Sequence, residues 1–206
     1  ISPMNQPDHR LDFLVRELPS PESARRFFGQ FAERDPSQAN RLRRKEGVLS
    51  DVLTLASYSP LLSTTLIQNP EYVTWLAGKR NETAVQRQED LLESLARFAL
   101  THSGLEANVM LARFRRRELL RIFLRDIRRL STVAEITEEI SGLADTIIEY
   151  AVRLARQEID NRYGTPFQAD EKRRGFPADV CVVSLGKLGS KELNYSSDID
   201  LLFIYS

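Results

Sequence analysis

Apolar residues recur with a helical period through most of the chain. Within 83–102, Leu91, Leu95 and Phe98 follow one another at spacings of four and three residues, which places them on one stripe of a helix. Such a stripe is stable only when it packs on neighbouring elements. The pattern therefore predicts an amphipathic helix within a helical bundle.

Two more long helices are predicted with little linker between them. One covers about 105–130, and another covers about 143–163 and stops at Gly164. Thr132 and Glu135 have the spacing of a capping box, in which each side chain bonds the backbone N–H of the other at a helix start. The helices are therefore expected to follow one another closely.

Prolines mark helix starts nearer the N-terminus. Ser20-Pro21 and Asn69-Pro70 each place a capping side chain before a proline of the first helical turn. The sequence contains no internal repeat of about 20 to 50 residues, which disfavours a helical solenoid. A helical bundle docked on an α/β domain fits the pattern better.

The pattern changes near residue 165. The stretch 165–178 is polar and charged, and within it 170–175 predicts an exposed loop. The β-branched run Val180–Leu185 then predicts a buried strand. A second apolar run, Leu201 to Tyr205, predicts another strand. We therefore expect an α+β fold, with a predominantly helical region over 1–165 and the first part of an α/β domain over 166–206.

A glycine-bearing turn follows the first predicted strand. Gly189 and Ser190 are expected to lead into a short helix from about Ser190. Free N–H groups in such a turn, the positive end of a helix dipole and the serine hydroxyl all favour an anion. The turn is therefore a candidate phosphate site, although a lone glycine turn is usually only a turn.

Two aspartates open the second strand. Asp198 and Asp200 are two residues apart, so in an extended segment their carboxylates face the same side. Such carboxylates repel each other unless a cation lies between them, and their hard oxygens suit Mg²⁺ or Mn²⁺. The pair alone is more often a solvated strand end. Beside a phosphate-binding turn, it favours metal-assisted phosphoryl or nucleotidyl transfer.

Two further residues are candidates for phosphate binding. Lys187 either neutralises a phosphate or faces solvent, and we weigh these interpretations equally. Ser197 precedes the first aspartate and either orients it or contacts a phosphate. Asn194 and Tyr195 are expected to fix the turn rather than to perform chemistry.

The run Gly186-Lys-Leu-Gly-Ser-Lys-Glu-Leu-Asn-Tyr-Ser-Ser-Asp-Ile-Asp-Leu-Leu-Phe203 closely resembles the nucleotidyltransferase signature of the glutamine synthetase adenylyltransferase/deadenylylase family. Members of that family add AMP to a tyrosine of glutamine synthetase and remove it. They carry two such domains, and the form Glu192-Leu-Asn-Tyr-Ser-Ser-Asp198 is more similar to the N-terminal, AMP-removing copy. Weaker similarity extends upstream to 69–76, 114–122 and 163–166.

The resemblance implies a polymerase-β-like nucleotidyltransferase domain in which phosphate attacks the AMP–tyrosine ester and releases ADP. The implied site residues are Asp198 and Asp200 for catalysis and metal binding, and Gly189, Ser190, Lys187 and Ser197 for phosphate or nucleotide. The implied cofactor is Mg²⁺, with Mn²⁺ as a substitute. The implied partners are glutamine synthetase, the nitrogen-signalling PII protein, ATP or ADP, and phosphate.

Several features predict a truncated chain. The superfamily uses a third carboxylate on a later strand, and the sequence stops at Ser206, directly after the second predicted strand. Two short strands do not make a stable sheet alone. The chain also begins with Ile1, with its first methionine at Met4. We therefore expect a fragment without full activity. Ser184 and Ser190 replace small residues, mostly glycine, without affecting the resemblance.

Composition limits the partners and the compartment. The 29 Lys and Arg residues balance 29 Asp and Glu residues, so no global field draws the chain to nucleic acid or membrane. Cys181, the single cysteine, excludes an internal disulfide and is expected to be a small core residue. No apolar run approaches the roughly 20 residues of a membrane span, and no secretion signal precedes the helices. A cytoplasmic location is expected.

The helix predicted over 105–130 is rich in arginine. The favoured interpretation is a solvated face whose charge is balanced by residues such as Glu118. The alternative is that Arg117 or Arg121 contacts a phosphate or an adenylylated protein loop through its guanidinium fork.

Three other functions stay open on the sequence alone. One is a different nucleotidyltransferase, which the upstream resemblance disfavours. Another is a helical module that binds a partner protein and has no activity of its own. A nucleic-acid binder built on the arginine-rich helix is the weakest, because such binding usually needs a net basic surface.

Overall fold

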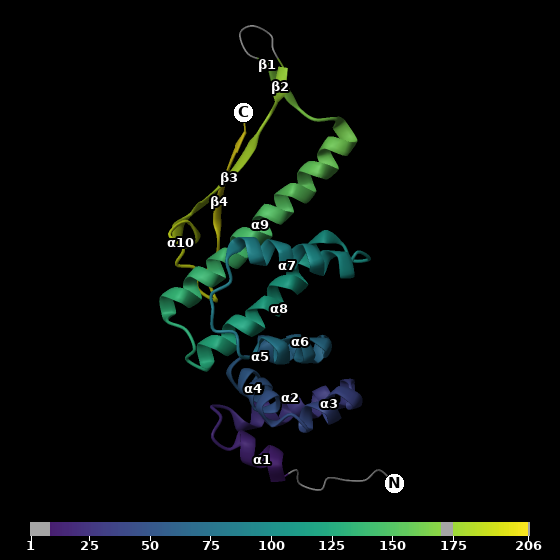
Figure 1. Cartoon of the computed structure of the whole chain (residues 1–206), viewed down its shortest axis with the longest axis vertical. Coiled ribbons are helices and arrows are strands. Elements are labelled where there is room, and N and C mark those ends of the chain that lie inside the picture. Colours follow the sequence, from purple (N-terminus) through teal and green to yellow (C-terminus); the bar gives the residue numbers. More distant parts are fainter. Residues whose placement is uncertain (1–8, 170–174, 206) are drawn as a thin grey trace. The chain divides into compact units, whose positions relative to one another are not determined.

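The structure, a computed structural model, describes residues 9–169 and 175–205. The chain has a mostly helical α+β fold (Figure 1), as predicted from the sequence. It divides into two compact units: unit 1 comprises residues 1–83 and 116–130, and unit 2 comprises 84–115 and 131–206. The change from helix to strand falls after residue 163, and the domain boundary expected near 165 stays a prediction.

Short helices form unit 1. The described elements are α1 (His9–Val15), α2 (Pro21–Arg34), α3 (Pro36–Arg43), α4 (Glu46–Tyr58), α5 (Pro60–Gln68), α6 (Glu71–Lys79) and the later part of α8 (Ala107–Ile127). Their apolar sides share one core, in which Phe31, Leu53 and Leu66 are fully buried. Leu120 and Leu124 bring α8 into the same core.

One of the two predicted helix starts is confirmed and the other is wrong. Helix α2 begins at Pro21 with Ser20 as its N-cap residue, but the Ser20 side chain forms no capping hydrogen bond and instead donates to Ser23 Oγ at 2.8 Å. Asn69 does not cap the next helix, because its buried side chain donates to the Thr65 carbonyl oxygen at 2.9 Å and closes the end of α5. Helix α6 begins at Glu71 instead.

A mostly buried carboxylate connects three segments of unit 1. Arg80, just after α6, donates from Nε to Asp51 Oδ2 at 2.7 Å, and Nε of Arg128 lies 3.9 Å from Asp51 Oδ1. The hydrogen bond to Asp51 raises the pKa of the Arg80 guanidinium above its ordinary value. A Cβ at Gly47, one turn before Asp51, would lie 2.8 Å from that guanidinium. Glycine at this position therefore leaves room for the ion pair.

Unit 2 combines helices with two small sheets. Its elements are α7 (Gln88–Thr101), the first part of α8, α9 (Val133–Tyr163), β1 (Phe167–Ala169), β2 (Gly175–Pro177), β3 (Val180–Leu185), α10 (Gly186–Gly189) and β4 (Asp200–Tyr205). Helix α7 packs on α9 (Figure 1). Leu91, Leu95 and Phe98 are buried, which confirms the predicted amphipathic stripe.

Helix α9 starts at the predicted capping box. The Thr132 N–H donates to Glu135 Oε2 at 2.7 Å, and the Glu135 N–H donates to Thr132 Oγ1 at 3.3 Å. From there the helix runs unbroken for 31 residues to Tyr163, so the stretch predicted over 143–163 is its C-terminal part and the helix begins ten residues earlier than 143. Gly164 ends it with a φ of 81°, a conformation that favours glycine.

Two short strands flank the loop predicted over 170–175, and the second of them includes Gly175. β1 pairs antiparallel with β2, with Phe167 opposite Pro177. A three-residue strand is too short to show the alternation from which strands are predicted. Residues 170–174 of this stretch lie outside the described residues. Among the helices that the structure describes, none has both the length and the apolar character needed to cross a membrane.

The Asp51 ion pair generates a stability prediction. Asp51→Asn is expected to lower the free energy of unfolding by about 1–3 kcal/mol, since it weakens charge-assisted hydrogen bonds to two arginines in a mostly buried place. Urea unfolding of the chain measures this. As a control, Asp12→Asn removes the charge from an exposed pair with Arg25 and should change stability by less than about 0.5 kcal/mol. Equal losses in both variants would contradict the prediction.

Candidate active site

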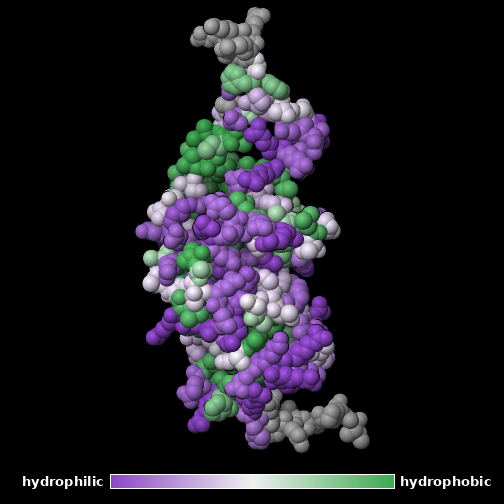
Figure 2. Space-filling view, viewed as in Figure 1, coloured by the Kyte–Doolittle hydropathy of each residue, from purple (hydrophilic) through white to green (hydrophobic). Residues whose placement is uncertain are grey.

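An antiparallel ribbon of β3 and β4 carries the predicted site. Val180 pairs with Tyr205 at one end and Leu185 with Asp200 at the other, which confirms both predicted strands. The ribbon is exposed, however: Phe203 is 61% and Tyr205 84% exposed. Figure 2 shows hydrophobic side chains gathered over this part of the molecule.

The expectation that Cys181 and its strand are buried is therefore wrong for this chain. Cys181 is exposed, because two paired strands form a single layer and no third strand joins this sheet within the described residues. Part of the ribbon faces α9 across an apolar groove of about 440 Å³, which Val152, Ile159 and Phe203 help to line.

A tight turn, α10, follows β3. Gly186 has a φ of 56°, which favours glycine. Gly189 allows a close approach of the backbone, because a Cβ there would lie 2.6 Å from the Ser184 carbonyl oxygen. The geometry of the turn therefore requires both glycines.

Helix α10 ends at Gly189 and Ser190 is its C-cap residue, where we expected a helix to begin. Ser190 Oγ donates to the carbonyl oxygens of Gly186 and Lys187, each at 3.3 Å. The dipole argument for an anion at Ser190 is therefore wrong, since the C-terminal end of a helix is its negative end. The assignment of Gly189 and Ser190 to phosphate binding stays a prediction that rests on the family resemblance.

The chain leaves α10 through a Schellman motif. The Glu192 N–H donates to the Lys187 carbonyl oxygen at 2.8 Å, and the Lys191 N–H donates to that of Leu188 at 3.1 Å. Lys191 has a φ of 61°, which costs a residue with a side chain about 1 kcal/mol. The Lys191 ammonium forms an ion pair with Asp145 of α9, which favours this backbone turn.

Buried leucines and a serine hold this segment on α9. Leu188 is fully buried and Leu193 is 5% exposed. The Leu193 N–H donates to Ser141 Oγ at 3.1 Å, and Ser141 Oγ donates to the Thr137 carbonyl oxygen at 2.7 Å. Because Ser141 is fully buried, water cannot replace this partner of the N–H. A long helix therefore supports the loop that leads to the aspartates.

Asn194 closes the loop between α10 and β4. Its Oδ1 accepts from the Ser196 N–H at 3.0 Å and from Ser197 Oγ at 2.8 Å. The Asn194 N–H in turn donates to Ser197 Oγ at 3.2 Å. The expected role of Asn194 in fixing the turn is confirmed, and the Ser197 hydroxyl takes part in that turn directly before Asp198.

The structure brings one of the two aspartates to the turn. Asp198 lies just before β4, Asp200 is the first residue of β4, and both side chains are exposed. A Cβ at Gly186 would lie 3.3 Å from Asp200 Oδ2, so this carboxylate lies beside the start of α10. A larger residue at Gly186 would crowd it.

The donor chemistry of Asp198 and Asp200 fits a hard divalent cation. Mg²⁺ takes six oxygen ligands and usually keeps several waters, so two carboxylates suffice as its protein ligands. Within the described residues, no group of three or more His, Cys, Asp or Glu side chains could hold a metal ion. Lys187 is exposed and forms no ion pair with any residue that the structure describes.

Glu118 balances arginine charge on α8 as expected, but it does so inside unit 1 rather than on a solvated face. Arg121 is 1% exposed and donates from Nε to Glu118 Oε2 at 3.0 Å. The guanidinium of Arg117 lies 4.7 Å from the centre of the Trp75 ring, a cation–π distance. The side chains of Arg117 and Arg121 pack inside unit 1 and form no open phosphate site, whereas Arg115 and Arg116 are exposed. Trp75 itself packs against the core of unit 1.

Ser141 and Asp145 are the supporting residues that the sequence analysis missed. Both lie on α9, and the Ser141–Leu193 bond spans 52 positions of the chain. Ser141 stands between the apolar residues Ile140 and Leu143 on a buried side of the helix. A small polar residue in such a stripe is the one signal that could have identified it.

Comparison with known families places the chain among nucleotidyl-transferring proteins. Residues 49–206 match the sequence model described as glutamate-ammonia ligase adenylyltransferase. Since the match covers most of the chain, the protein belongs to this family.

Three curated relatives share the name bifunctional glutamine synthetase adenylyltransferase/adenylyl-removing enzyme. The Mannheimia haemolytica protein is 29% identical over 165 residues, which is 79% of this chain and 17% of that protein. The Nitrosococcus oceani protein is 34% identical over 149 residues, covering 71% and 15%. The Pseudomonas aeruginosa protein is 43% identical over 95 residues, covering 46% and 9%. The chain thus spans less than a fifth of each of these relatives.

Removal of the Ser141 hydroxyl tests the support of the loop. Ser141→Ala leaves the Leu193 N–H without its partner and should lower the free energy of unfolding by about 1–3 kcal/mol. Hydrogen exchange should show faster exchange at the Leu193 amide. Thr146→Val is the control, since that buried hydroxyl bonds the Gly142 carbonyl oxygen of its own helix and no other described residue. Unchanged protection of Leu193 in Ser141→Ala would contradict the anchoring role.

Opposite effects are expected at two glycines. Gly189→Ala places a methyl group against the Ser184 carbonyl oxygen and should destabilise unit 2 by about 1–3 kcal/mol. Gly29→Ala, in the middle of α2 with open space around it, should stabilise the chain by about 0.5–1 kcal/mol. Thermal unfolding of both variants measures the difference in sign. Equal stabilisation would show that the α10 turn tolerates a side chain.

Proposed function

We propose that this chain contributes metal- and phosphate-binding residues to a site that removes AMP from a tyrosine of glutamine synthetase. The observation that carries the proposal is the position of the Asp200 carboxylate beside the α10 turn, in a member of the adenylyltransferase family. The relatives are named as both AMP-adding and AMP-removing enzymes. The form of 192–198 favours the AMP-removing copy.

In the proposed reaction, an oxygen of inorganic phosphate bonds to the phosphorus of the AMP–tyrosine ester. The bond from that phosphorus to the tyrosine oxygen breaks, and the tyrosine oxygen takes a proton. The products are ADP and free tyrosine. The main task of the protein is to hold two negatively charged groups in line, because positioning and charge neutralisation dominate phosphoryl-transfer catalysis.

The aspartates would hold the metal. Asp198 and Asp200 both present exposed carboxylates, and the proposed ion is Mg²⁺, with Mn²⁺ as a substitute. When bound, the ion would neutralise phosphate charge and stabilise the leaving oxygen. Gly186 keeps the space beside Asp200 free, and Ser197 fixes the loop before Asp198.

The turn residues would hold phosphate. Lys187 is an exposed cation at the turn, so it can approach a phosphate oxygen without breaking an ion pair to a described residue. Gly189 carries no side chain that would block a ligand from the backbone. Ser190 would turn its hydroxyl away from the carbonyl oxygens that it now bonds.

The proposal also implies partners. Glutamine synthetase carrying AMP would be the protein substrate, phosphate the co-substrate and ADP the product. The PII protein would report nitrogen status, and ATP would serve the AMP-adding activity of a complete enzyme. These partners would place the reaction in the cytoplasm.

The test uses a complete enzyme that contains this chain. With AMP-modified glutamine synthetase, phosphate and Mg²⁺, we expect ADP release that Asp198→Asn and Asp200→Asn each reduce by about 100-fold or more. Asp90→Asn, at an exposed ion pair on α7, is the matched control and should keep full activity.

The same variants should still add AMP to glutamine synthetase from ATP, since the proposal assigns only removal to this site. Loss of AMP addition with intact ADP release would contradict the assignment. Intact ADP release in both aspartate variants would contradict the metal-binding role.

A further inference from the structure

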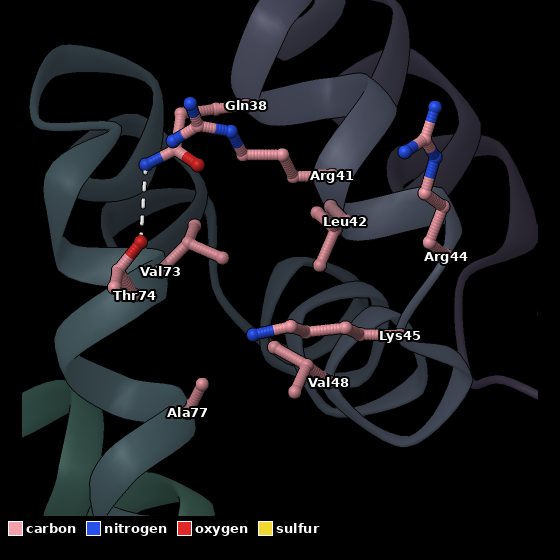
Figure 3. Close-up of a pocket in the computed structure, with 9 residues that line it drawn as sticks. All are labelled: Gln38, Arg41, Leu42, Arg44, Lys45, Val48, Val73, Thr74 and Ala77. Atoms are coloured by element: carbon pink, nitrogen blue, oxygen red, sulfur yellow. Dashed lines mark hydrogen bonds between the residues drawn. The ribbon is translucent and has the colours of Figure 1, made fainter.

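A small apolar pocket lies in unit 1, away from the residues proposed for AMP removal in sequence. It has a volume of about 250 Å³ and lies between α3, α4 and α6 (Figure 3). Its floor is aliphatic and formed by Leu42, Val48, Val73 and Ala77. The first three of these are at most 8% exposed, so the floor is part of the packed helices rather than a mobile surface.

Cations surround this floor. Arg41, Arg44 and Lys45 belong to the lining, and none of the nine lining residues carries a carboxylate. None of the three cations forms an ion pair with any residue that the structure describes. In Figure 3, Lys45 extends across Val48 toward α6, and Arg41 extends toward Gln38. The pocket therefore combines an apolar floor with an uncompensated positive rim.

Lys45 lies between two helices. It is the N-cap residue of α4, where its side chain forms no capping hydrogen bond and its charge faces the positive end of the helix dipole. It also directly follows Arg44, the C-cap residue of α3, and its N–H donates to the Leu42 carbonyl oxygen at 3.0 Å. Its charge is therefore favourable for α3 and unfavourable for α4, and Arg41 and Arg44 lie at the same favourable end of α3.

The mouth of the pocket is already formed. Gln38 Nε2 of α3 donates to Thr74 Oγ1 of α6 at 3.1 Å, a bond drawn in Figure 3. The Gln38 N–H donates to Asp35 Oδ1 at 2.9 Å, which caps the start of α3. A pocket held open in this way loses little conformational entropy on binding.

We propose that this pocket binds an acidic segment of a partner protein, with one aliphatic side chain of that segment on the floor and its carboxylates against Arg41, Arg44 and Lys45. The volume is below the roughly 300–1,000 Å³ of a small-molecule site but suits a single anchoring side chain. The lining has no aromatic ring on which a nucleotide base could stack.

The exposed rim determines how binding depends on salt. The three cations are exposed, so their attraction for carboxylates is screened by salt. Affinity should therefore fall several-fold between about 50 and about 300 mM salt.

The probe for the test is a short fluorescein-labelled peptide, Glu-Asp-Leu-Glu-Glu-Leu-Asp-Glu, followed by anisotropy. The variant R41E/R44E/K45E should bind it at least about tenfold more weakly. A matched control with the same change in net charge, R16E/R26E/R116E, replaces exposed arginines outside the pocket and should bind like the unmodified chain. Circular dichroism checks that both variants fold.

The floor is tested separately. Ala77→Leu fills the pocket with apolar volume and leaves the rim cations in place, so it should weaken binding of the peptide. A peptide with serine in place of its leucines should bind the unmodified chain more weakly, by the same factor by which Ala77→Leu weakens binding of the leucine peptide. The affinity of the serine peptide should not change in Ala77→Leu. Equal binding by the rim variant and its control would overturn the proposal. Tighter binding of a single-stranded oligonucleotide, with the same sensitivity to the rim variant, would also overturn it.

Discussion

The hydrogen bond between the Leu193 N–H and the Ser141 hydroxyl determines where the candidate active site lies. It is buried, and the burial of Leu188 and Leu193 surrounds it with apolar contacts on α9. The α10 turn and the start of β4 both continue from this anchored segment, so the position of Asp200 depends on it. The site is thus held by a helix that belongs to a distant part of the sequence.

The sequence predicts those features that local physics determines. The Thr132–Glu135 capping box and the strands β3 and β4 follow from neighbouring residues and are found as predicted. The placement of a helix after Ser190 was wrong, because the close contact of Gly189 with Ser184 and the left-handed Lys191 end the helix early. The pairing of Ser141 with Leu193 could not be predicted, since no local pattern connects residues so far apart. The roles of the site residues themselves remain predictions.

The net charge of this chain is zero, but its buried and its exposed cations have different roles. Asp51 holds Arg80 and Arg128 within unit 1, and Arg121 is buried beside Glu118. Carboxylates inside the folded unit balance the charge of these cations. The cations around the aliphatic pocket form no ion pair with a described residue. This contrast distinguishes a structural arginine from one that is available to a partner.

The exposed β3–β4 ribbon affects how the protein behaves in solution at high concentration. Within the described residues no further strand pairs with its edges, and most apolar side chains of β4 are exposed, with Leu201 half-buried. Edges of this kind are templates on which identical chains add strand to strand. At high concentration, the colloidal behaviour of a preparation would therefore depend on one short strand, however stable the helices are.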